Sequence, residues 1–345
     1  MFSSVMYPTL HHLLRRTRVL AAGLILALAT AGTTRAQDFL NVQAEPVPPE
    51  VERIYQHGLD FLVATQETNG SWADSQNNVG IVGLAVLAIL AHGEDPNVGP
   101  YADTVRKALD YLLGQANTDT GYIGRSMYNH GFATLALAEA YGQVDDDRLA
   151  PALQKAVALI VASQAKNPTG AWRYSPQSND ADTTVSGAIM VALFAARNAG
   201  IDVPDEVFAK AIGFYKRMQS PEDGGFGYTS PGGSNSPRTA IGVLVLALAK
   251  DRESEMYRKA FHWLKQNQDA NVNYHQYYYL YYAAQAFFHS DPESWRAWNT
   301  ANIKTLMSTQ GTNGSWTGTQ GATFTTSAAL LSLAVNYRFL PIYER

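Results

Sequence analysis

The segment "QETNGSW" occupies Gln66–Trp72, and the segment "QGTNGSW" occupies Gln310–Trp316 near the other end of the chain. Six of the seven letters match. Self-similarity of this kind is typical of a repeat architecture, in which each repeat is one supersecondary unit. The opening glutamine recurs at intervals of 42 to 55 residues, at Gln66, Gln115, Gln164, Gln219, Gln268 and Gln310.

An aromatic residue follows each of these glutamines by six to eight positions, at Trp72, Tyr122, Trp172, Phe226, Tyr274 and Trp316. A glycine comes between the two in five of the repeats, at Gly70, Gly121, Gly170, Gly224 and Gly314. The fifth repeat, "QDANVNY", lacks this glycine and is degenerate.

Each repeat also predicts two helices. Apolar residues at helical spacing precede the glutamine, as in "GLDFLVATQ", and an almost wholly apolar segment such as "VGLAVLAILA" follows the aromatic residue. A helix that is apolar all round must be buried. Six amphipathic helices around six buried ones predict an all-α (α/α)6 toroid, a closed barrel of six helical hairpins. An open solenoid would need polar end repeats, whereas here the end repeats carry the best copies of the motif.

The motif itself has a structural interpretation. The glutamine lies near the end of an outer helix, where carbonyl groups lack partners, and its amide can bond the backbone of a neighbouring turn. The glycine permits a tight turn with positive φ. We expect the indole to pack over the amide, so that the motif joins adjacent repeats and closes the ring between the first and the last.

Composition excludes several kinds of protein. The chain has 345 residues, a net charge of −4 and no cysteine, so disulfides, thiolate metal sites and a cysteine nucleophile are excluded. The weak acidity argues against a nucleic-acid partner. The histidines and acids show no metal-ligand spacing, and we expect no cofactor. A peripheral contact with a membrane and the oligomeric state stay open.

The N-terminus resembles a secretory signal peptide over residues 1–36, because basic residues, an apolar run and "TRA" follow one another. A linker over 37–49 and a single toroid over 50–345 complete the expected organisation. We therefore expect an exported protein, periplasmic or extracellular. An uncleaved N-terminal anchor and a twin-arginine export signal are the alternatives.

The repeated phrases resemble the QW motifs of the squalene–hopene and oxidosqualene cyclases and the repeats of protein prenyltransferase β-subunits, over about residues 50–335. This resemblance implies the same toroid. Class II cyclases carry an Asp-x-Asp-Asp motif whose middle aspartate donates the proton. Here "DADTT" matches it at Asp180 and Asp182, with Thr183 in the last place. The zinc site of the prenyltransferases needs a cysteine and cannot be carried over.

Polar residues gather where the inner helices are expected to begin, and in a closed ring they would face one opening. The binding candidates among them are Asn129, His130, Thr183, Arg238 and His275; Asn78, Thr184, Thr239, Gln276, Thr325 and Thr326 share the same level. Each has a plainer interpretation: Asp182 as a helix cap, Asp180 as a solvated carboxylate, the histidines as structural, and Arg238 as one half of an ion pair.

The fifth inner helix, "NYHQYYYLYYAAQAFF", places five tyrosines on one helical face: Tyr274, Tyr277, Tyr278, Tyr281 and Tyr282. Facing outward, they would be ordinary packing. Facing the lumen, Tyr277, Tyr278 and Tyr281 would offer π faces and hydroxyls to a ligand.

Three functions remain. The first is a binding toroid that holds an isoprenoid, a glycan or another extended ligand as a small-molecule partner, without full cyclase chemistry. The second is a terpene cyclase-like enzyme, an isomerase, in which Asp182 is the Brønsted acid and Asp180 its partner. The third is a polysaccharide hydrolase or lyase. Whether the protein is an enzyme stays open at this point.

Overall fold

The computed structural model describes residues 46–75, 79–268 and 275–343. These residues form twelve α-helices and no β-sheet, which confirms the predicted all-α class. Pro48–Arg345 is one compact unit. The predicted signal peptide, the linker before residue 46, Asn78 and Tyr274 lie outside the described residues.

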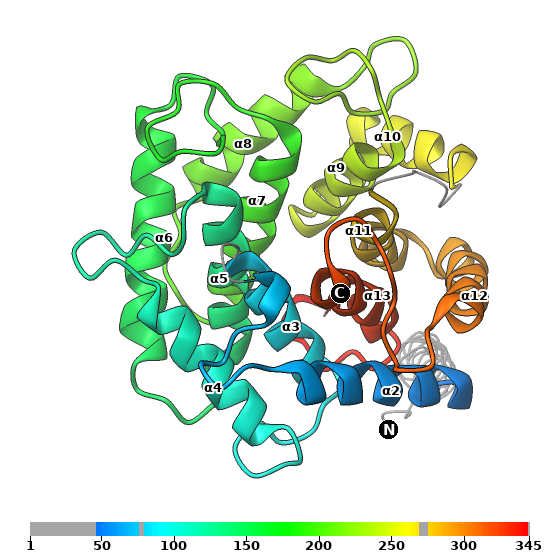
Figure 1. The fold of residues 1–345 in the computed structure, drawn as a ribbon. Helices are drawn as coiled ribbons and strands as arrows, with labels where there is room; N and C mark the ends of the chain where they lie inside the picture. The colour runs from blue at the N-terminus through cyan, green and yellow to red at the C-terminus, as the bar shows by residue number, and fades with distance from the viewer. Residues whose placement is uncertain (1–45, 76–78, 269–274, 344–345) are drawn as a thin grey trace, which may run out of the picture. The chain divides into compact units, whose positions relative to one another are not determined.

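The helices alternate along the chain between an inner and an outer ring (Figure 1). The inner helices are α3 (Val79–Leu90), α5 (Met127–Ala140), α7 (Thr183–Asn198), α9 (Ser236–Leu248), α11 (Gln276–Ser290) and α13 (Ala322–Ala334). The outer helices are α2 (Pro49–Thr65), α4 (Ala102–Gly114), α6 (Leu149–Lys166), α8 (Asp205–Met218), α10 (Glu255–Gln266) and α12 (Pro292–Thr309). Each inner helix touches the next, and α13 touches α3, so the inner ring is closed as predicted.

The inner helices pack closely because small residues lie at their contacts. All twelve residues of α3 are buried. A Cβ placed on Gly83 of α3 would lie 2.7 Å from the carbonyl oxygen of Phe132 in α5, and one on Gly187 of α7 would lie 2.1 Å from the Ile241 side chain in α9. The glycines therefore let neighbouring helices approach to a distance that a larger side chain would prevent.

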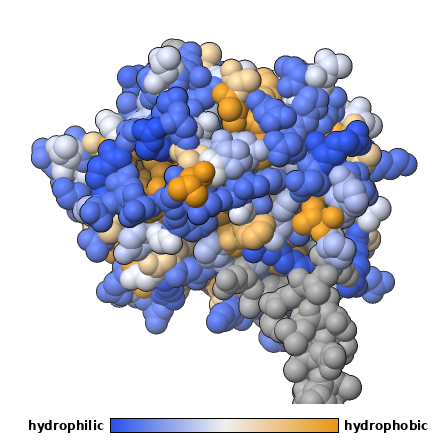
Figure 2. All heavy atoms as spheres, turned by 90° about the horizontal axis from the view of Figure 1, so that it is seen from below, coloured by the Kyte–Doolittle hydropathy of each residue, from blue (hydrophilic) through white to orange (hydrophobic). Residues whose placement is uncertain are grey.

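The outer helices are amphipathic and expose their polar faces. Helix α8 shows the pattern, with Asp205 and Glu206 in its first turn and Lys216 and Arg217 in its last, which complements the helix dipole. None of the described helices has the length and apolar character needed to cross a membrane. On the face drawn in Figure 2, apolar side chains lie in separate spots among hydrophilic ones.

The repeated glutamine joins neighbouring outer helices, as the sequence predicted. Gln310 Nε2 donates to the carbonyl oxygen of Gly314 at 2.9 Å and to that of Ile54 in α2 at 2.8 Å. Gln66, Gln164 and Gln219 repeat this arrangement, each bonding the carbonyl of its own motif glycine and one carbonyl in the next outer helix. One amide thus fixes both the turn and the adjacent repeat.

The motif glycines are required by both conformation and space. All five have positive φ, between 73° and 89°. A Cβ on Gly70 would lie 2.0 Å from the carbonyl oxygen of Lys107, and one on Gly314 would lie 2.0 Å from that of His57. The turn therefore lies directly against the backbone of the next outer helix.

The motif tryptophans are buried and hydrogen-bonded. Trp72, Trp172 and Trp316 donate their indole N–H to the carbonyls of Leu62, Ile160 and Leu306 at 2.9–3.0 Å. We expected these indoles to pack over the glutamine amide. Their observed role is to bond a carbonyl in the second half of the preceding outer helix, which anchors the motif turn to that helix.

Two further bonds close the ring between the two ends of the toroid. Asp74 accepts from the backbone N–H of Thr323 at 2.9 Å, which ties the first motif to the start of α13. Tyr337 donates its hydroxyl to Glu52 in α2 at 2.8 Å. Together with the Gln310 amide, these contacts join the first repeat to the last. This explains why the motif is present near both ends of the chain.

The second and fifth repeats do not make the glutamine bond, so the count of intact motifs from sequence was too high. In the second repeat, a one-residue shift places Ala116 opposite Ile123, where the first repeat pairs Gln66 with Trp72. Gln115 is left exposed. The Gln268 side chain bonds Lys265 within its own segment.

Other contacts join the outer helices at these two places. Three aromatic rings connect α10, α11 and α12 in the fifth repeat. The ring centroid of Phe287 lies 5.8 Å from that of Phe261 and 5.7 Å from that of Trp298. In the second repeat, Arg148 at the start of α6 pairs with Asp110 of α4 at 2.6 Å. Aromatic packing and an ion pair thus replace the missing amide.

The centre of the barrel is filled by aromatic side chains. Tyr281 and Tyr282 of α11 lie 4.6 Å apart between ring centroids, and Tyr281 reaches Phe132 of α5 across the lumen at 6.2 Å. All three are buried. The C-terminal turn Pro341–Tyr343 packs against α7, and its Tyr343 is buried as well. Within the barrel, the space available to a ligand therefore lies at the mouth.

Candidate functional site

A pocket of about 400 Å³ opens at the mouth, where the inner helices begin. Its walls come from the starts of α5, α7, α9 and α11 and from three loops that precede inner helices. The lining residues are Tyr128, Tyr174, Thr184, Tyr228, Asn235, Pro237, Arg238, His275, Tyr278 and Gln320. Of the site residues predicted from sequence, Arg238, His275 and Tyr278 line it.

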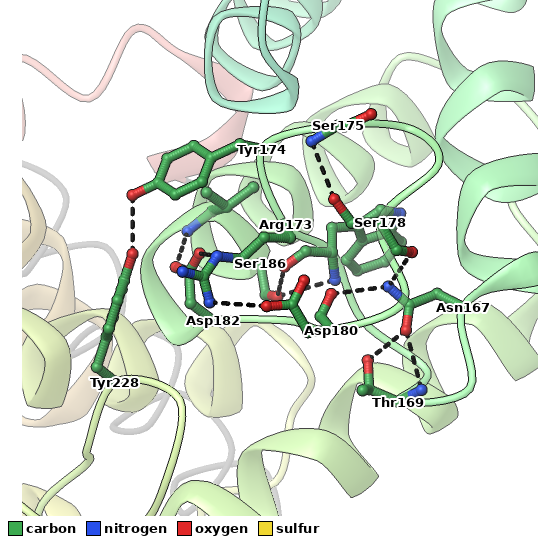
Figure 3. A network of polar contacts seen from close by, with 12 residues as sticks. Asn167, Thr169, Arg173, Tyr174, Ser175, Ser178, Asp180, Asp182, Ser186 and Tyr228 are labelled. Atoms are coloured by element: carbon green, nitrogen blue, oxygen red, sulfur yellow. Dashed lines mark hydrogen bonds and ion pairs between the residues drawn. The ribbon is translucent and has the colours of Figure 1, made fainter.

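Two lining tyrosines come from motif loops and were missed in the sequence. Tyr174 follows Trp172 by two residues, and Tyr228 follows Phe226 by two, in "WRY" and "FGY". Their hydroxyls are hydrogen-bonded to each other at 2.8 Å (Figure 3). In an extended segment, side chains two apart point the same way, so an aromatic-x-Tyr pattern after the motif glycine was the available signal.

Asp182 is the N-cap of α7 and is fully buried. Its Oδ1 accepts from the backbone N–H groups of Thr184 and Val185, both at 2.8 Å, and from the Thr184 hydroxyl at 2.7 Å. Oδ2 takes no hydrogen bond from the described residues. Asp182 therefore has the capping function that was the plainer interpretation of its position, and one oxygen remains without a hydrogen bond.

Arg173 lies between the two predicted acids (Figure 3). Its Nη1 is 3.3 Å from Asp180 Oδ2, and its Nε is 3.4 Å from Asp182 Oδ2. The same guanidinium lies over the rings of Tyr174 and Tyr228, at 5.3 and 5.2 Å from their centroids. One cation thus serves both carboxylates and supports the tyrosine wall of the pocket.

The loop that carries these groups is held in place by Asn167 (Figure 3). Its Nδ2 donates to the carbonyls of Ser178 and Asp180 at 3.0 and 2.9 Å, and its Oδ1 accepts from the backbone and hydroxyl of Thr169. Asp180 itself remains largely exposed, with 62 % of its side chain accessible to solvent. It is therefore a solvated loop carboxylate paired with Arg173.

Burial raises the pKa of Asp182 above its ordinary value, while the hydrogen bonds from Thr184 and Val185 and the charge of Arg173 lower it. Burial also raises the pKa of Tyr278 well above its ordinary value. The Tyr278 hydroxyl therefore stays protonated near neutral pH and acts as a neutral donor and acceptor.

His130 lies in the core rather than in the pocket. Its Nδ1 accepts from the backbone N–H of Ile123 at 3.1 Å, so its Nε2 carries the proton and donates to the carbonyl of Ala156 at 3.0 Å. Burial lowers the pKa of His130 to about 4. Ser186, Thr239 and Thr326 accept the corresponding N–H in other repeats. Some of the polar residues that the sequence placed at the mouth therefore have a structural role, since they hold the motif loop against the inner helix.

Asn129 and Thr183 also make backbone contacts outside the lining. Asn129 Oδ1 accepts from the N–H of Gly80 at 3.3 Å, and both Asn129 and Thr183 are buried. Thr183 donates its hydroxyl to the carbonyl of Gly227 at 2.8 Å, in the loop that carries Tyr228. These two residues position the walls of the mouth, and a direct role in binding stays a prediction.

The tyrosines of α11 point in different directions. Tyr278 and Tyr281 face the lumen, since they meet Tyr128 and Phe132 of the non-adjacent helix α5 at 6.2 Å. Tyr279 points outward as the helical phase predicted, with its hydroxyl 3.3 Å from the Gln268 carbonyl oxygen. Tyr277 lies beside Gly318 and Thr309 near the end of α12, away from the pocket lining.

Arg238 is half-buried beside Tyr228, with its guanidinium 5.8 Å from the ring centroid. No acid of the described residues lies within 4.0 Å of it, so the ion pair considered from sequence is not formed. Burial lowers the pKa of Arg238. Among the described residues, no three histidine or acidic side chains are grouped so that they could hold a metal ion.

A family model described as "Domain of unknown function (DUF6288)" matches residues 51–275. A search of the curated proteins found no match. A variant of the type II terpene cyclase MstE from Scytonema, in complex with merosterolic acid A, aligns at TM-score 0.60 with 16% identity, covering 84% of this chain and 98% of that one. An inactive variant of an α-1,6-mannanase from Salegentibacter sp., in complex with α-1,6-mannotriose, aligns at TM-score 0.66 with 10% identity, covering 84% and 99%.

At these identities the likeness concerns the fold alone. Both structural neighbours are α/α toroids of similar extent, which confirms the predicted architecture. The predicted likeness to terpenoid cyclases is confirmed at that level, while the sequence family that matches the chain carries no assigned activity.

Proposed function

The chain belongs to the DUF6288 family, and we propose that its toroid binds a short glycan in the mouth pocket without cyclase chemistry. The observation that carries this proposal is the composition of the pocket wall. Four tyrosines line it together with the polar side chains of Thr184, Asn235 and Gln320. Aromatic faces can cover the apolar face of a sugar ring while hydroxyls and amides bond its hydroxyl groups.

A long hydrocarbon fits this site less well. An isoprenoid would need an extended apolar cavity, and the lumen below the pocket is occupied by Phe132, Tyr281 and Tyr282. The α-1,6-mannanase of the same fold was solved with mannotriose, which supports the use of such a toroid for sugars.

Hydrolysis of a glycan is less well supported than binding. Glycoside hydrolases use two carboxyl groups that flank the scissile bond. None of the lining residues within the described part of the chain is an aspartate or glutamate. Asp180 and Asp182 are both paired with Arg173, so neither carboxylate is directed at the pocket.

A glycan array probed with the purified toroid tests the proposal, followed by calorimetry with the best oligosaccharide. Tyr228→Ala should weaken binding roughly 10-fold or more, since an aromatic contact contributes about 0.5–1.5 kcal/mol beyond its burial. Tyr141→Ala is the matched control, because Tyr141 is partly exposed at the end of α5, outside the pocket. Binding to no glycan, or equal loss in both variants, would refute the proposal.

Acid-initiated cyclisation is the second candidate, favoured by the buried Asp182 with one oxygen free of hydrogen bonds and a raised pKa. A proton donor to an alkene must be neutral before it acts. Asp182→Asn keeps the cap acceptor and removes the acidic proton. Conversion of a polyprene by the wild type, lost in this variant, would establish the cyclase and displace the binding proposal.

Export is part of the proposal and rests on the tripartite pattern of residues 1–36. A glycan-binding toroid outside the cytoplasm would meet polysaccharides directly. N-terminal sequencing of the mature protein should give a start near Gln37. A secreted form that still begins at Met1 would contradict the cleavable signal peptide.

A further inference from the structure

The charges around the mouth pocket are unevenly distributed. Arg173 has two carboxylates, Asp180 and Asp182, within 3.4 Å. Arg238 lines the pocket and has no acid within 4.0 Å among the described residues, as noted above. A half-buried cation without a counter-charge is unfavourable, because the charge loses hydration and no anion replaces it.

The backbone around Arg238 adds to the positive potential. Arg238 lies in the first turn of α9, whose N-cap is the uncharged Asn235, so the positive end of the helix dipole is not neutralised there. The N-cap of α7, by contrast, is the carboxylate Asp182. The lining of the pocket thus has a cation and an uncompensated helix N-terminus on the α9 side.

A buried hydroxyl on the neighbouring wall, formed by α11, also makes no hydrogen bond of normal geometry to the described residues. Tyr278 is only 7 % exposed and lines the pocket. Its hydroxyl lies near those of Tyr128 and Tyr282, yet none of them meets it with the geometry of a hydrogen bond. This donor could bond a ligand that enters between the α9 and α11 walls.

We propose that the pocket selects glycans that carry an anionic group, a uronate carboxylate or a sulfate ester, which pairs with the Arg238 guanidinium. This inference rests on the proposed glycan-binding function and specifies its ligand class. A planar guanidinium can donate two parallel hydrogen bonds to either group, which fixes orientation as well as charge. The sugar ring then lies against the tyrosine walls.

Paired probes test this inference. The glycan array should carry neutral, uronate-bearing and sulfated oligosaccharides. The best acidic ligand is then compared by calorimetry with its neutral form, obtained by carboxyl reduction or desulfation. We expect the acidic form to bind about 10- to 100-fold more tightly, the range of one charged hydrogen-bonded contact. The two acidic series also tell a carboxylate from a sulfate ligand.

Arg238→Gln should abolish the preference for the acidic form, and Arg106→Gln is the matched control, because Arg106 lies exposed on α4 beside Asp103. If Arg238→Gln does not fold, the salt dependence of the wild type decides. Affinity for the acidic glycan should fall between low and high salt, while that for the neutral form stays constant.

The outcomes separate the two proposals. Equal affinity for acidic and neutral forms, with binding still lost in Tyr228→Ala, would overturn the anionic ligand and leave glycan binding intact. An acidic preference that persists in Arg238→Gln would overturn the role of Arg238. Binding to no oligosaccharide of any series would overturn both.

Discussion

Removal of the Gln310 amide should open the toroid at the point where its two ends meet. Gln310 Nε2 bonds Ile54 of α2 at 2.8 Å and Gly314 of its own turn at 2.9 Å. Gln310→Ala removes both bonds and takes this donor away from the carbonyls of Ile54 and Gly314. The substitution therefore weakens the junction between α12 and α2 more than it weakens the other junctions between outer helices.

The magnitude follows from the number of bonds. Each neutral hydrogen bond contributes about 0.5–1.5 kcal/mol net, so two bonds predict a loss of about 1–3 kcal/mol in the free energy of unfolding. Gln115→Ala provides the matched control. Gln115 opens the second repeat, but it is exposed and its side chain makes no hydrogen bond with another described residue. Its substitution should change stability by less than about 0.5 kcal/mol.

Urea denaturation of both variants measures the loss, and amide hydrogen exchange locates it. In Gln310→Ala, exchange should accelerate in α2 and α12 before it does in α6 and α8, because local opening exposes the helices at the weakened junction. Equal losses in the two variants, or exchange that rises uniformly around the ring, would refute the closing role of Gln310.

Gly314→Ala should cost several kcal/mol by urea denaturation, because its Cβ would lie 2.0 Å from a carbonyl oxygen of α2, whereas Gly142→Ala, with similar φ and open space, should cost only about 1 kcal/mol. His130 has a folded pKa of about 4, below the ordinary 6.5, so its contribution is present above pH 6.5 and is lost as pH falls towards 4. Wild-type stability should drop over this range by up to about 3 kcal/mol more than that of His130→Gln, and parallel pH curves would contradict this. Tyr278→Ala should weaken glycan binding measured by calorimetry far more than Tyr279→Ala, which points outward; equal effects would contradict the assigned directions.

Much of the fold could be predicted because the repeat motif follows from simple physical requirements. A glutamine at a helix end and a glycine in the next turn indicated the amide bond and the positive φ, and both are present at Gln66 and Gly70. The pattern could not show in which repeats the glutamine makes its hydrogen bonds. A one-residue shift in the second repeat puts Ala116 in the place of the glutamine, and only the backbone pairing reveals it.

The candidate site was harder to predict, since the level of a residue on its helix does not fix where its side chain points. Asn129 and Arg238 hold equivalent places, each one residue before the group that accepts the motif N–H, yet Asn129 bonds the Gly80 backbone and Arg238 faces the pocket. The tyrosines of the loops were overlooked because loop geometry depends on contacts such as those of Asn167. Sequence patterns describe helices better than the loops between them.

A crystal structure of the toroid with its best-binding trisaccharide tests most directly whether the ligand site is the mouth pocket. We predict sugar density against the rings of Tyr174 and Tyr228, with an acidic group beside Arg238. Tyr281 and Tyr282 should remain in contact below it, as they are now at 4.6 Å. Density among separated Tyr281 and Tyr282 rings, deep in the lumen, or a mouth pocket left empty at saturating trisaccharide, would contradict the proposed site.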